Sequence, residues 1–209
     1  ILHDLVKRVL TDHQRIIFNG NGYEDAWVED ARKRGLSNLT CTADALKTYL
    51  QPKHIELFSK HHVFTEEELR ARNEIHLENY CEVVGIEART MIDMVKRNIF
   101  PAVSRFSGDT AKAVATKKAV LADLDCSDDE ALLRKLSALS VEMMRQTAAL
   151  EDALAAPHGK NAYEAAHYYR YTVFEIMGKL RASVDALEAI TSRDCWPYPS
   201  YTELLFSVK

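Results

Sequence analysis

The chain has 209 residues, of which 47% are hydrophobic and 28% are charged, and its 27 basic and 31 acidic side chains give a net charge of −4. This length can bury one sizeable core or form a smaller unit joined to a larger one. Charges of both signs are interspersed, so we expect neither a nucleic acid nor a membrane surface as a partner. Because the sequence has no apolar run long enough to span a bilayer and no secretory leader, it predicts a cytoplasmic protein.

The composition, with only 7 Gly and 5 Pro, is typical of a protein built from long helices. We therefore predict a mainly α fold, in which long antiparallel helices form a bundle that follows several short helices. The numbering opens on Ile1 inside an apolar helical pattern, which indicates a segment of a longer protein. The four cysteines, without a Cys-x-x-Cys pair, are expected to be reduced and mostly buried; they are Cys41, Cys81, Cys126 and Cys195.

The first 64 residues predict short elements. An amphipathic helix covers residues 2–10, and residues 15–18 are compatible with a short extended run. An Asn/Gly turn at 19–22 leads into a helix of about a dozen residues, for which Gly35 is the natural C-terminal cap. The turn has neither a Gly-x-Gly-x-x-Gly pattern nor a Gly-Lys-Ser/Thr pattern, so we interpret it as a connection rather than a nucleotide loop. Two short helices follow, beginning near Thr42 and at Pro52.

A much longer helix is predicted from Thr65, which begins a capping box with Glu68. Its apolar stripe extends to Phe106 and includes Pro101, where we expect a kink rather than a stop. Gly108 ends this helix in one interpretation, and in the other the helix continues with a bend towards residue 124.

Two further long helices are predicted. A second capping box at residues 127–130 begins one with an apolar stripe to Leu154, and another stripe extends from Ala165 to Thr191. The tight reversal predicted at residues 157–159 forces these helices to be antiparallel. Because five methionines lie at helical spacing among leucines, we interpret them as core filler. The short basic clusters 32–34 and 117–118 are interpreted as solvated faces.

The tail from Cys195 to Phe206 begins with two prolines at alternate positions, which favour an extended path. Its large apolar side chains are expected to pack onto this protein or onto a neighbouring subunit, because exposed patches of this kind are rare.

No complete catalytic constellation is evident in the sequence. Glu164 and His167 form a Glu-x-x-His half-motif, as in di-iron bundles, but such a site needs a second motif and further glutamates, which we do not find. We therefore expect no catalytic, cofactor-binding or metal-binding residue in this chain. Tyrosine buries apolar area while keeping a polar tip, so an interface is the alternative to core for the tyrosine-rich helix. The candidate interface residues, including those of the tail, are Tyr163, Tyr168, Tyr169, Tyr171, Trp196 and Tyr198.

Several segments, in order along the chain, together resemble the C-terminal region of type III glutamine synthetases. The opening pieces are residues 15–23 (RIIFNGNGY), 24–27 (EDAW) and 33–36 (KRGL). Further pieces are 63–69 (VFTEEEL), 78–80 (ENY), 87–88 (EA) with 91–94 (MIDM), 196–199 (WPYP) and 204–206 (LLF). Each piece is weak by itself, and the combination is specific.

The resemblance implies a parent enzyme that joins ammonia to glutamate with ATP and Mg²⁺ in a large ring-shaped oligomer, its catalytic residues lying upstream of Ile1. It also suggests four parts: 1–40, the end of the synthetase core; 41–64, connecting helices; 65–192, the long-helix bundle; and 193–209, the tail. The expected partners are the upstream catalytic domain and further copies of the chain. Assembly or regulation is the role expected for this domain. The alternatives are a stand-alone metalloenzyme using Glu164 and His167, and a docking module for a regulatory protein.

Overall fold

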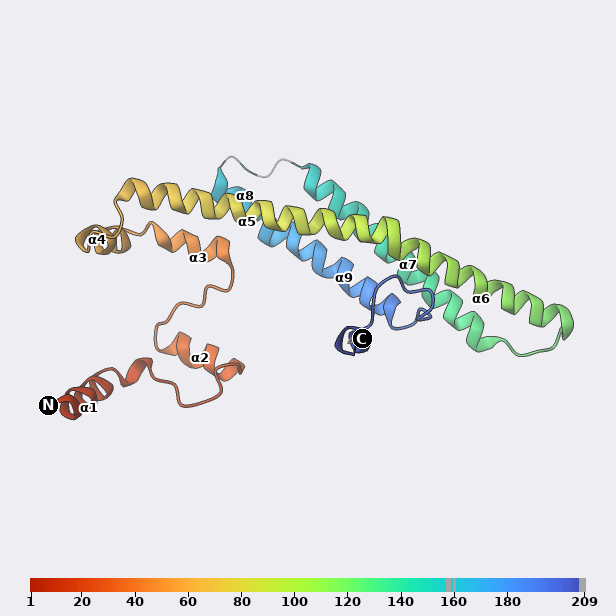
Figure 1. The fold of residues 1–209 in the computed structure, drawn as a ribbon, viewed down its shortest axis with the longest axis horizontal. Helices are drawn as coiled ribbons and strands as arrows, with labels where there is room; N and C mark the ends of the chain where they lie inside the picture. Colours follow the sequence, from red (N-terminus) through yellow and green to blue (C-terminus); the bar gives the residue numbers. More distant parts are fainter. Residues whose placement is uncertain (157–158, 160, 207–209) are drawn as a thin grey trace.

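The computed structural model describes residues 1–156, 159 and 161–206, and within these ranges the chain forms helices and no strand (Figure 1). The predicted mainly α fold is confirmed. Three long helical rods lie side by side, an arm of short helices precedes them, and a folded tail follows them.

The short helices of the arm are α1 (Leu2–Asp12), α2 (Asp25–Lys33), α3 (Thr42–Tyr49) and α4 (Pro52–Lys60). They confirm the predicted positions, and Gly35 has the positive φ of 77° that a glycine cap adopts. The extended run predicted for 15–18 is wrong over its first part. A 3₁₀ turn, η1 (Gln14–Ile16), follows α1, and the backbone becomes extended only at Ile17. The turn forms because the Ile16 and Ile17 amides donate to the carbonyl groups of His13 and Gln14, respectively.

The first rod consists of α5 (Glu66–Met94), a π-helical turn η2 (Val95–Ile99) and α6 (Phe100–Val120). Thr65 and Glu68 form the predicted capping box. The wide turn comes directly before Pro101, where the missing amide and the bulky ring disfavour a regular α-helix, and the rod bends there instead of stopping (Figure 1). Gly108 lies inside α6, so the helix continues past it, as in the second of the two interpretations.

The second rod is α7 (Ser127–Ala155), and the third consists of α8 (Ala162–Tyr168), a π-helical turn η3 (Tyr169–Val173) and α9 (Phe174–Glu188). The capping box predicted at the start of α7 is wrong. Cys126 occupies the N-cap position, and the Asp125 carboxylate accepts the Ser127 amide at 2.9 Å, so the capping side chain is that of the residue just before the N-cap. Residues 157 and 158 of the predicted reversal lie outside the described residues. The second rod nevertheless runs antiparallel to both of its neighbours (Figure 1).

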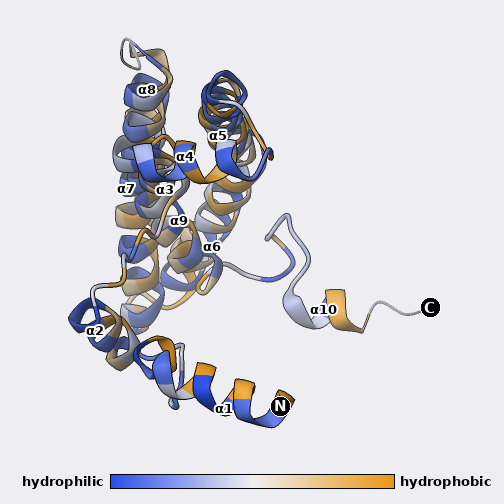
Figure 2. Cartoon of the chain, turned by 90° about the vertical axis from the view of Figure 1, so that its left-hand side faces the viewer, coloured by the Kyte–Doolittle hydropathy of each residue, from blue (hydrophilic) through white to orange (hydrophobic). Residues whose placement is uncertain are grey.

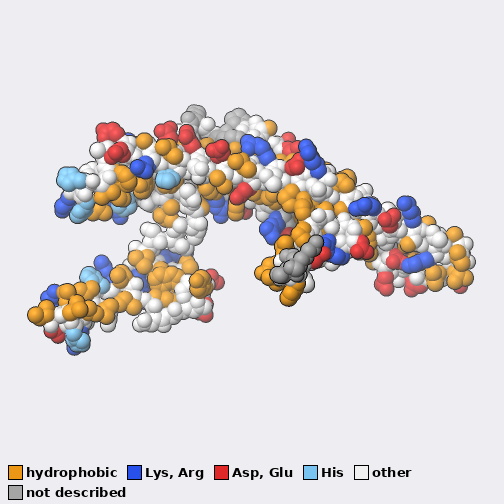
Figure 3. Space-filling model, in the orientation of Figure 1, with side chains coloured by type: hydrophobic (Ala, Val, Ile, Leu, Met, Phe, Trp, Pro, Cys, Tyr) orange, Lys and Arg blue, Asp and Glu red, His pale blue; other side chains and the backbone are white. Residues whose placement is uncertain are grey.

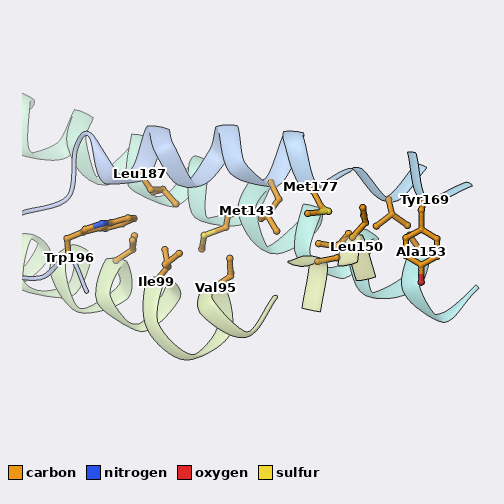
Figure 4. Close-up of a cluster of buried hydrophobic side chains, with 14 of the residues drawn as sticks. Val95, Ile99, Met143, Leu150, Ala153, Tyr169, Met177, Leu187 and Trp196 are labelled. Atoms are coloured by element: carbon orange, nitrogen blue, oxygen red, sulfur yellow. The ribbon is translucent and has the colours of Figure 1, made fainter. Parts of the chain in front are cut away.

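The core lies between the three rods (Figure 4). Val95 and Ile99 of η2 face Met143 of α7, while Met177 and Leu187 of α9 close the third side. The interpretation of the methionines as core filler is confirmed, since Met143 and Met177 are buried and Met91, Met94 and Met144 pack half-buried against the cluster.

Buried hydroxyl groups within the second rod and just after the end of the third do not disturb this apolar core. Thr147 is fully buried and donates to the Met143 carbonyl at 2.8 Å, and Thr191 donates to the Leu187 carbonyl at 2.7 Å. Each hydroxyl is thus satisfied by its own helix, four residues back.

The tail leaves α9 and returns to the bundle. Trp196 is 8% exposed and packs into the main core, with Tyr198 half-buried beside it. A short helix that we did not predict, α10 (Tyr201–Leu205), follows. The expected packing onto this protein is therefore confirmed for the first aromatic residues of the tail and not for the last apolar ones, which are exposed.

Candidate interaction surfaces

The first part of the arm forms a small unit of its own around α2. The Phe18 and Trp27 rings lie 4.8 Å apart, and the Arg34 guanidinium donates to the backbone carbonyls of Arg15 and Ile17 at 2.9 and 2.6 Å. Arg34 also pairs with Asp30 at 2.6 Å. These contacts fix the loop after α1 against α2.

One side of α1 is apolar and open (Figure 2). Its side chains follow helical spacing, yet none of them is buried by the described part of the chain. The exposed fractions are 74% for Leu2, 45% for Leu5, 48% for Val6, 45% for Val9 and 52% for Leu10. We call these five residues the α1 stripe.

A polar contact joins α3 to the third rod. The Tyr171 hydroxyl donates to the Asp44 carboxylate at 2.5 Å, and the Cys41 thiol donates to the same oxygen at 3.1 Å. These two hydrogen bonds, that from Tyr171 first, lower the pKa of Asp44. The same carboxylate raises the pKa of Tyr171 to about 12. The contact links the connecting helices to the bundle across 127 residues of sequence.

The structure does not gather the four candidate interface tyrosines on one face. Tyr169 is 6% exposed in the main core, and Tyr168 donates to the Ala153 carbonyl at 3.0 Å. Tyr163 packs half-buried against a small cluster around Ala43 of α3, and Tyr171 is 45% exposed. Two of these tyrosines therefore serve the bundle and two serve its junction with α3, and a contact with another chain stays a prediction.

The two candidate interface residues of the tail are brought together. Trp196 and Tyr198 line one shallow hollow with Met91, Met94 and Val184. Burial raises the pKa of Tyr198. Within the described chain these aromatic rings cover the end of the main core.

α10 is held firmly although it projects from the bundle. Ser200 and Glu203 form a capping box, with the Ser200 amide donating to the Glu203 carboxylate at 2.7 Å. Arg193 pairs with the same carboxylate and donates to the Trp196 carbonyl at 3.2 Å. The Ser-x-x-Glu pattern at 200–203 was the sequence signal for this helix, and we missed it.

The interpretation of the basic clusters as solvated faces is confirmed for Arg32, Lys33, Lys117 and Lys118, which are exposed, and is wrong for Arg34, which is half-buried and holds the loop after α1. Arg32 pairs with Glu29 inside α2. Lys117 pairs with Asp129 at 2.6 Å and Lys118 pairs with Glu130, so these lysines join the end of α6 to the start of α7.

The Glu-x-x-His half-motif, Glu164 with His167, lies at the surface of α8. Glu164 and His167 both lie on the exposed side of α8, and the His167 ring stacks on Tyr171 at 4.5 Å. Among the residues that the structure describes, no group of three histidine, cysteine or acidic side chains is arranged to hold a metal ion.

All four cysteines have free thiols; Cys126 is buried and the other three are half-buried. No helix in the described ranges is long and apolar enough to cross a membrane.

Known proteins match this chain along nearly its whole length. It is 37% identical over 207 residues to a glutamine synthetase of Butyrivibrio fibrisolvens, which covers 99% of the chain and 30% of that protein. A type-3 glutamine synthetase of Dictyostelium discoideum is 30% identical over 97% of the chain, and a glutamine synthetase of Bacteroides fragilis is 28% identical over 97%. The chain thus spans less than a third of the length of these relatives.

Residues 1–118 match the family described as the glutamine synthetase C-terminal domain. This match covers the arm and the first rod, and the curated relatives extend it through the other rods and the tail. The resemblance on which the sequence prediction was based is confirmed, and the chain belongs to the glutamine synthetase C-terminal domain family.

Proposed function

We propose that this chain is the C-terminal helical domain of a type III glutamine synthetase and serves its assembly or regulation. Ligation of ammonia to glutamate, with ATP and Mg²⁺, takes place in a preceding catalytic domain of the same protein. The parent is a cytoplasmic homo-oligomer. The described residues contain no cluster of three suitable side chains for a metal ion, and we assign ATP and Mg²⁺ to the preceding domain.

The observation that carries this proposal is the α1 stripe. Five apolar side chains on one helix face are 45–74% exposed, although the arm around them is ordered by Arg34 and by the Phe18–Trp27 contact. Full burial of a leucine or valine side chain stabilises a protein by about 1.5–3 kcal/mol, so a partner that covers the stripe gains considerably. The relatives have more than two thirds of their length outside the matched region, which supplies such a partner.

Deletion of residues 65–209 from the full-length protein tests the role of the bundle. We expect the particle to contain fewer subunits, as measured by light scattering, or the rate of glutamine formation to lose its normal dependence on substrate concentration, as measured by a synthetase assay. Unchanged particle size together with unchanged kinetics would contradict a role in assembly or regulation.

Point substitutions test the α1 stripe with less disturbance. Leu5→Gln combined with Val9→Gln keeps good helix formers and removes the apolar contact. We expect the full-length variant to lose thermal stability and activity together. The matched control, Lys7→Gln with Thr11→Gln on the polar side of α1, should behave like the unmodified protein. Equal behaviour of both variants would show that the stripe has no partner.

A further inference from the structure

The tail presents a second open apolar surface, on α10. Its residues Tyr201, Leu204, Leu205 and Phe206 are 77%, 60%, 55% and 77% exposed. Tyr201, Leu204 and Leu205 share one helix face because they are three and four residues apart. We call these four residues the α10 patch.

The α10 patch is exposed even though the tail that carries it is fixed to the bundle. The Trp196 side chain anchors the segment in the main core, and Arg193 reaches forward to both the Trp196 carbonyl and Glu203. Glu203 is also engaged by the Ser200 amide. With its carboxylate already paired, α10 offers a mainly apolar surface in a fixed place, which suits an apolar partner better than a basic one.

Both open apolar surfaces project away from the bundle. Figure 1 places α1 and α10 below the long rods, and Figure 2, a quarter turn away, shows α1 below the rods and α10 to one side of them. Figure 3 shows a wide concavity between the arm and the tail, with hydrophobic side chains gathered over each of them. One body seated in this concavity can contact both surfaces.

We propose that the α10 patch docks on the preceding domain of the same chain, so that the preceding domain is held between the arm and the tail. This inference depends on the proposed function for the existence of that domain. The relatives contain a segment more than twice as long as this chain outside the match, which is ample to fill the concavity. The same chain is favoured over a second copy because the arm joins that domain directly and borders the same concavity as the tail (Figure 3).

Site-specific photo-cross-linking in the full-length protein tests the inference. The photoreactive residue p-benzoylphenylalanine replaces Tyr201, which is 77% exposed on the face shared with Leu204 and Leu205, and the irradiated protein is separated on a denaturing gel and mapped by mass spectrometry. We expect cross-linked protein of monomer mass, in which residues 201–206 are joined to a segment that precedes Ile1. The same replacement at Thr202, outside the shared face of Tyr201, Leu204 and Leu205, is the control and should give a weaker product.

Three results would overturn the inference. Product of dimer mass would assign the patch to a second copy, and cross-links to residues of the bundle would mean that the tail folds back on it. A cross-linking yield at Tyr201 no higher than at Thr202 would mean that the patch is open to water. The readout does not depend on activity: a full-length protein that forms no glutamine would refute the proposed function, while a misplaced cross-link in an active enzyme would refute only the docking of α10.

A disruptive variant gives an independent measurement. Leu204→Ser with Phe206→Ser in the full-length protein should increase the rate of proteolysis at the junction between the preceding domain and the arm, because one of two attachments is lost. Thr202→Ser is the matched control. Equal rates of proteolysis at this junction in the double variant and in the control would contradict the inference.

Discussion

The bundle and its two flanking segments all have amphipathic helices, but only the helices of the bundle bury their apolar faces within the described chain. The rods α5–α6, α7 and α9 bury their apolar stripes against one another, and Leu136, Leu150 and Leu180 are fully buried. The α1 stripe has an equally regular spacing, but its residues remain 45–74% exposed. The α10 patch is likewise exposed, although Trp196, a few residues before it, is buried.

This difference shows that an amphipathic pattern specifies a helix and a face without specifying the partner of that face. The three rods supply partners for one another because short connections force them to be neighbours. The α1 stripe and the α10 patch have no such neighbour among the described residues. The comparison therefore separates a part that is complete in itself from two surfaces that await the rest of the protein, and four predictions test the division.

The tail gives the largest contrast within a short segment. Trp196→Ala should lower the free energy of unfolding of this chain by about 3–5 kcal/mol, because a large buried aromatic ring is lost from the core. Phe206→Ala, ten residues later, should change it by no more than about 0.5 kcal/mol. Urea denaturation followed by circular dichroism measures both values. Equal effects would mean that the α10 patch is already buried within this chain.

The bundle and the arm are compared by one type of substitution. Leu150→Ala removes a fully buried side chain and should cost about 2–5 kcal/mol, whereas Leu5→Ala in the α1 stripe should cost roughly 0.5 kcal/mol or less. The measurement is again urea denaturation of this chain. In the full-length protein the cost of Leu5→Ala should rise if the preceding domain covers the stripe. A large cost of Leu5→Ala in the short chain would end the distinction between bundle and arm.

Much of the fold could be predicted because local signals decide it. The Thr65–Glu68 capping box and Pro52 placed two helix starts correctly, and Gly35 placed one helix end. Gly108 was ambiguous since a glycine inside a helix costs only about 1 kcal/mol relative to alanine, which packing on both sides readily offsets. Ser127 was misplaced because Asp125 is an equally good acceptor for the first free amide of α7.

The interaction surfaces could be predicted less well because they depend on contacts between distant residues. The pairing of Asp44 with Tyr171 joins positions 127 residues apart, and no local pattern announces it. Similarly, residue type alone does not distinguish the tyrosines of α8 and η3. Their positions around the helix axis differ, so that Tyr169 lies in the core and Tyr171 lies at the surface. Only the α1 stripe could be identified as a face from sequence, and its exposure required the structure.

The junction between arm and bundle should depend on pH in both directions. The pKa of Asp44 is lowered in the folded chain, so its contribution is present above the ordinary aspartate pKa of about 3.9 and is lost as the pH falls below it. The pKa of Tyr171 is raised to about 12, so its contribution is present below the ordinary value of about 10 and is lost as the pH rises towards 12.

Asp44→Asn should therefore return the pKa of Tyr171 towards about 10, because the carboxylate that opposes ionisation is gone. Nuclear magnetic resonance of ¹³C-labelled tyrosine measures the titration directly. Asp123→Asn, in the connection between α6 and α7, is a control that should leave Tyr171 unchanged. A pKa of Tyr171 unaffected by Asp44→Asn would mean that α3 is not fixed to the third rod in solution.

The smallest effect is expected at the far end of the bundle, where ion pairs join the end of α6 to the start of α7. Lys117 and Lys118 pair with Asp129 and Glu130, and these contacts raise the pKa of both lysines. Because all four side chains are accessible to water and screened by salt, Lys117→Met with Lys118→Met should lower the melting temperature slightly at low ionic strength and not at high ionic strength. Lys112→Met, whose Asp109 partner lies in the same helix, should change neither value. If the double variant melts much lower at every salt concentration, the end of the α6–α7 hairpin depends on these lysines for packing as well as charge, and the bundle is less self-sufficient than its buried leucines indicate.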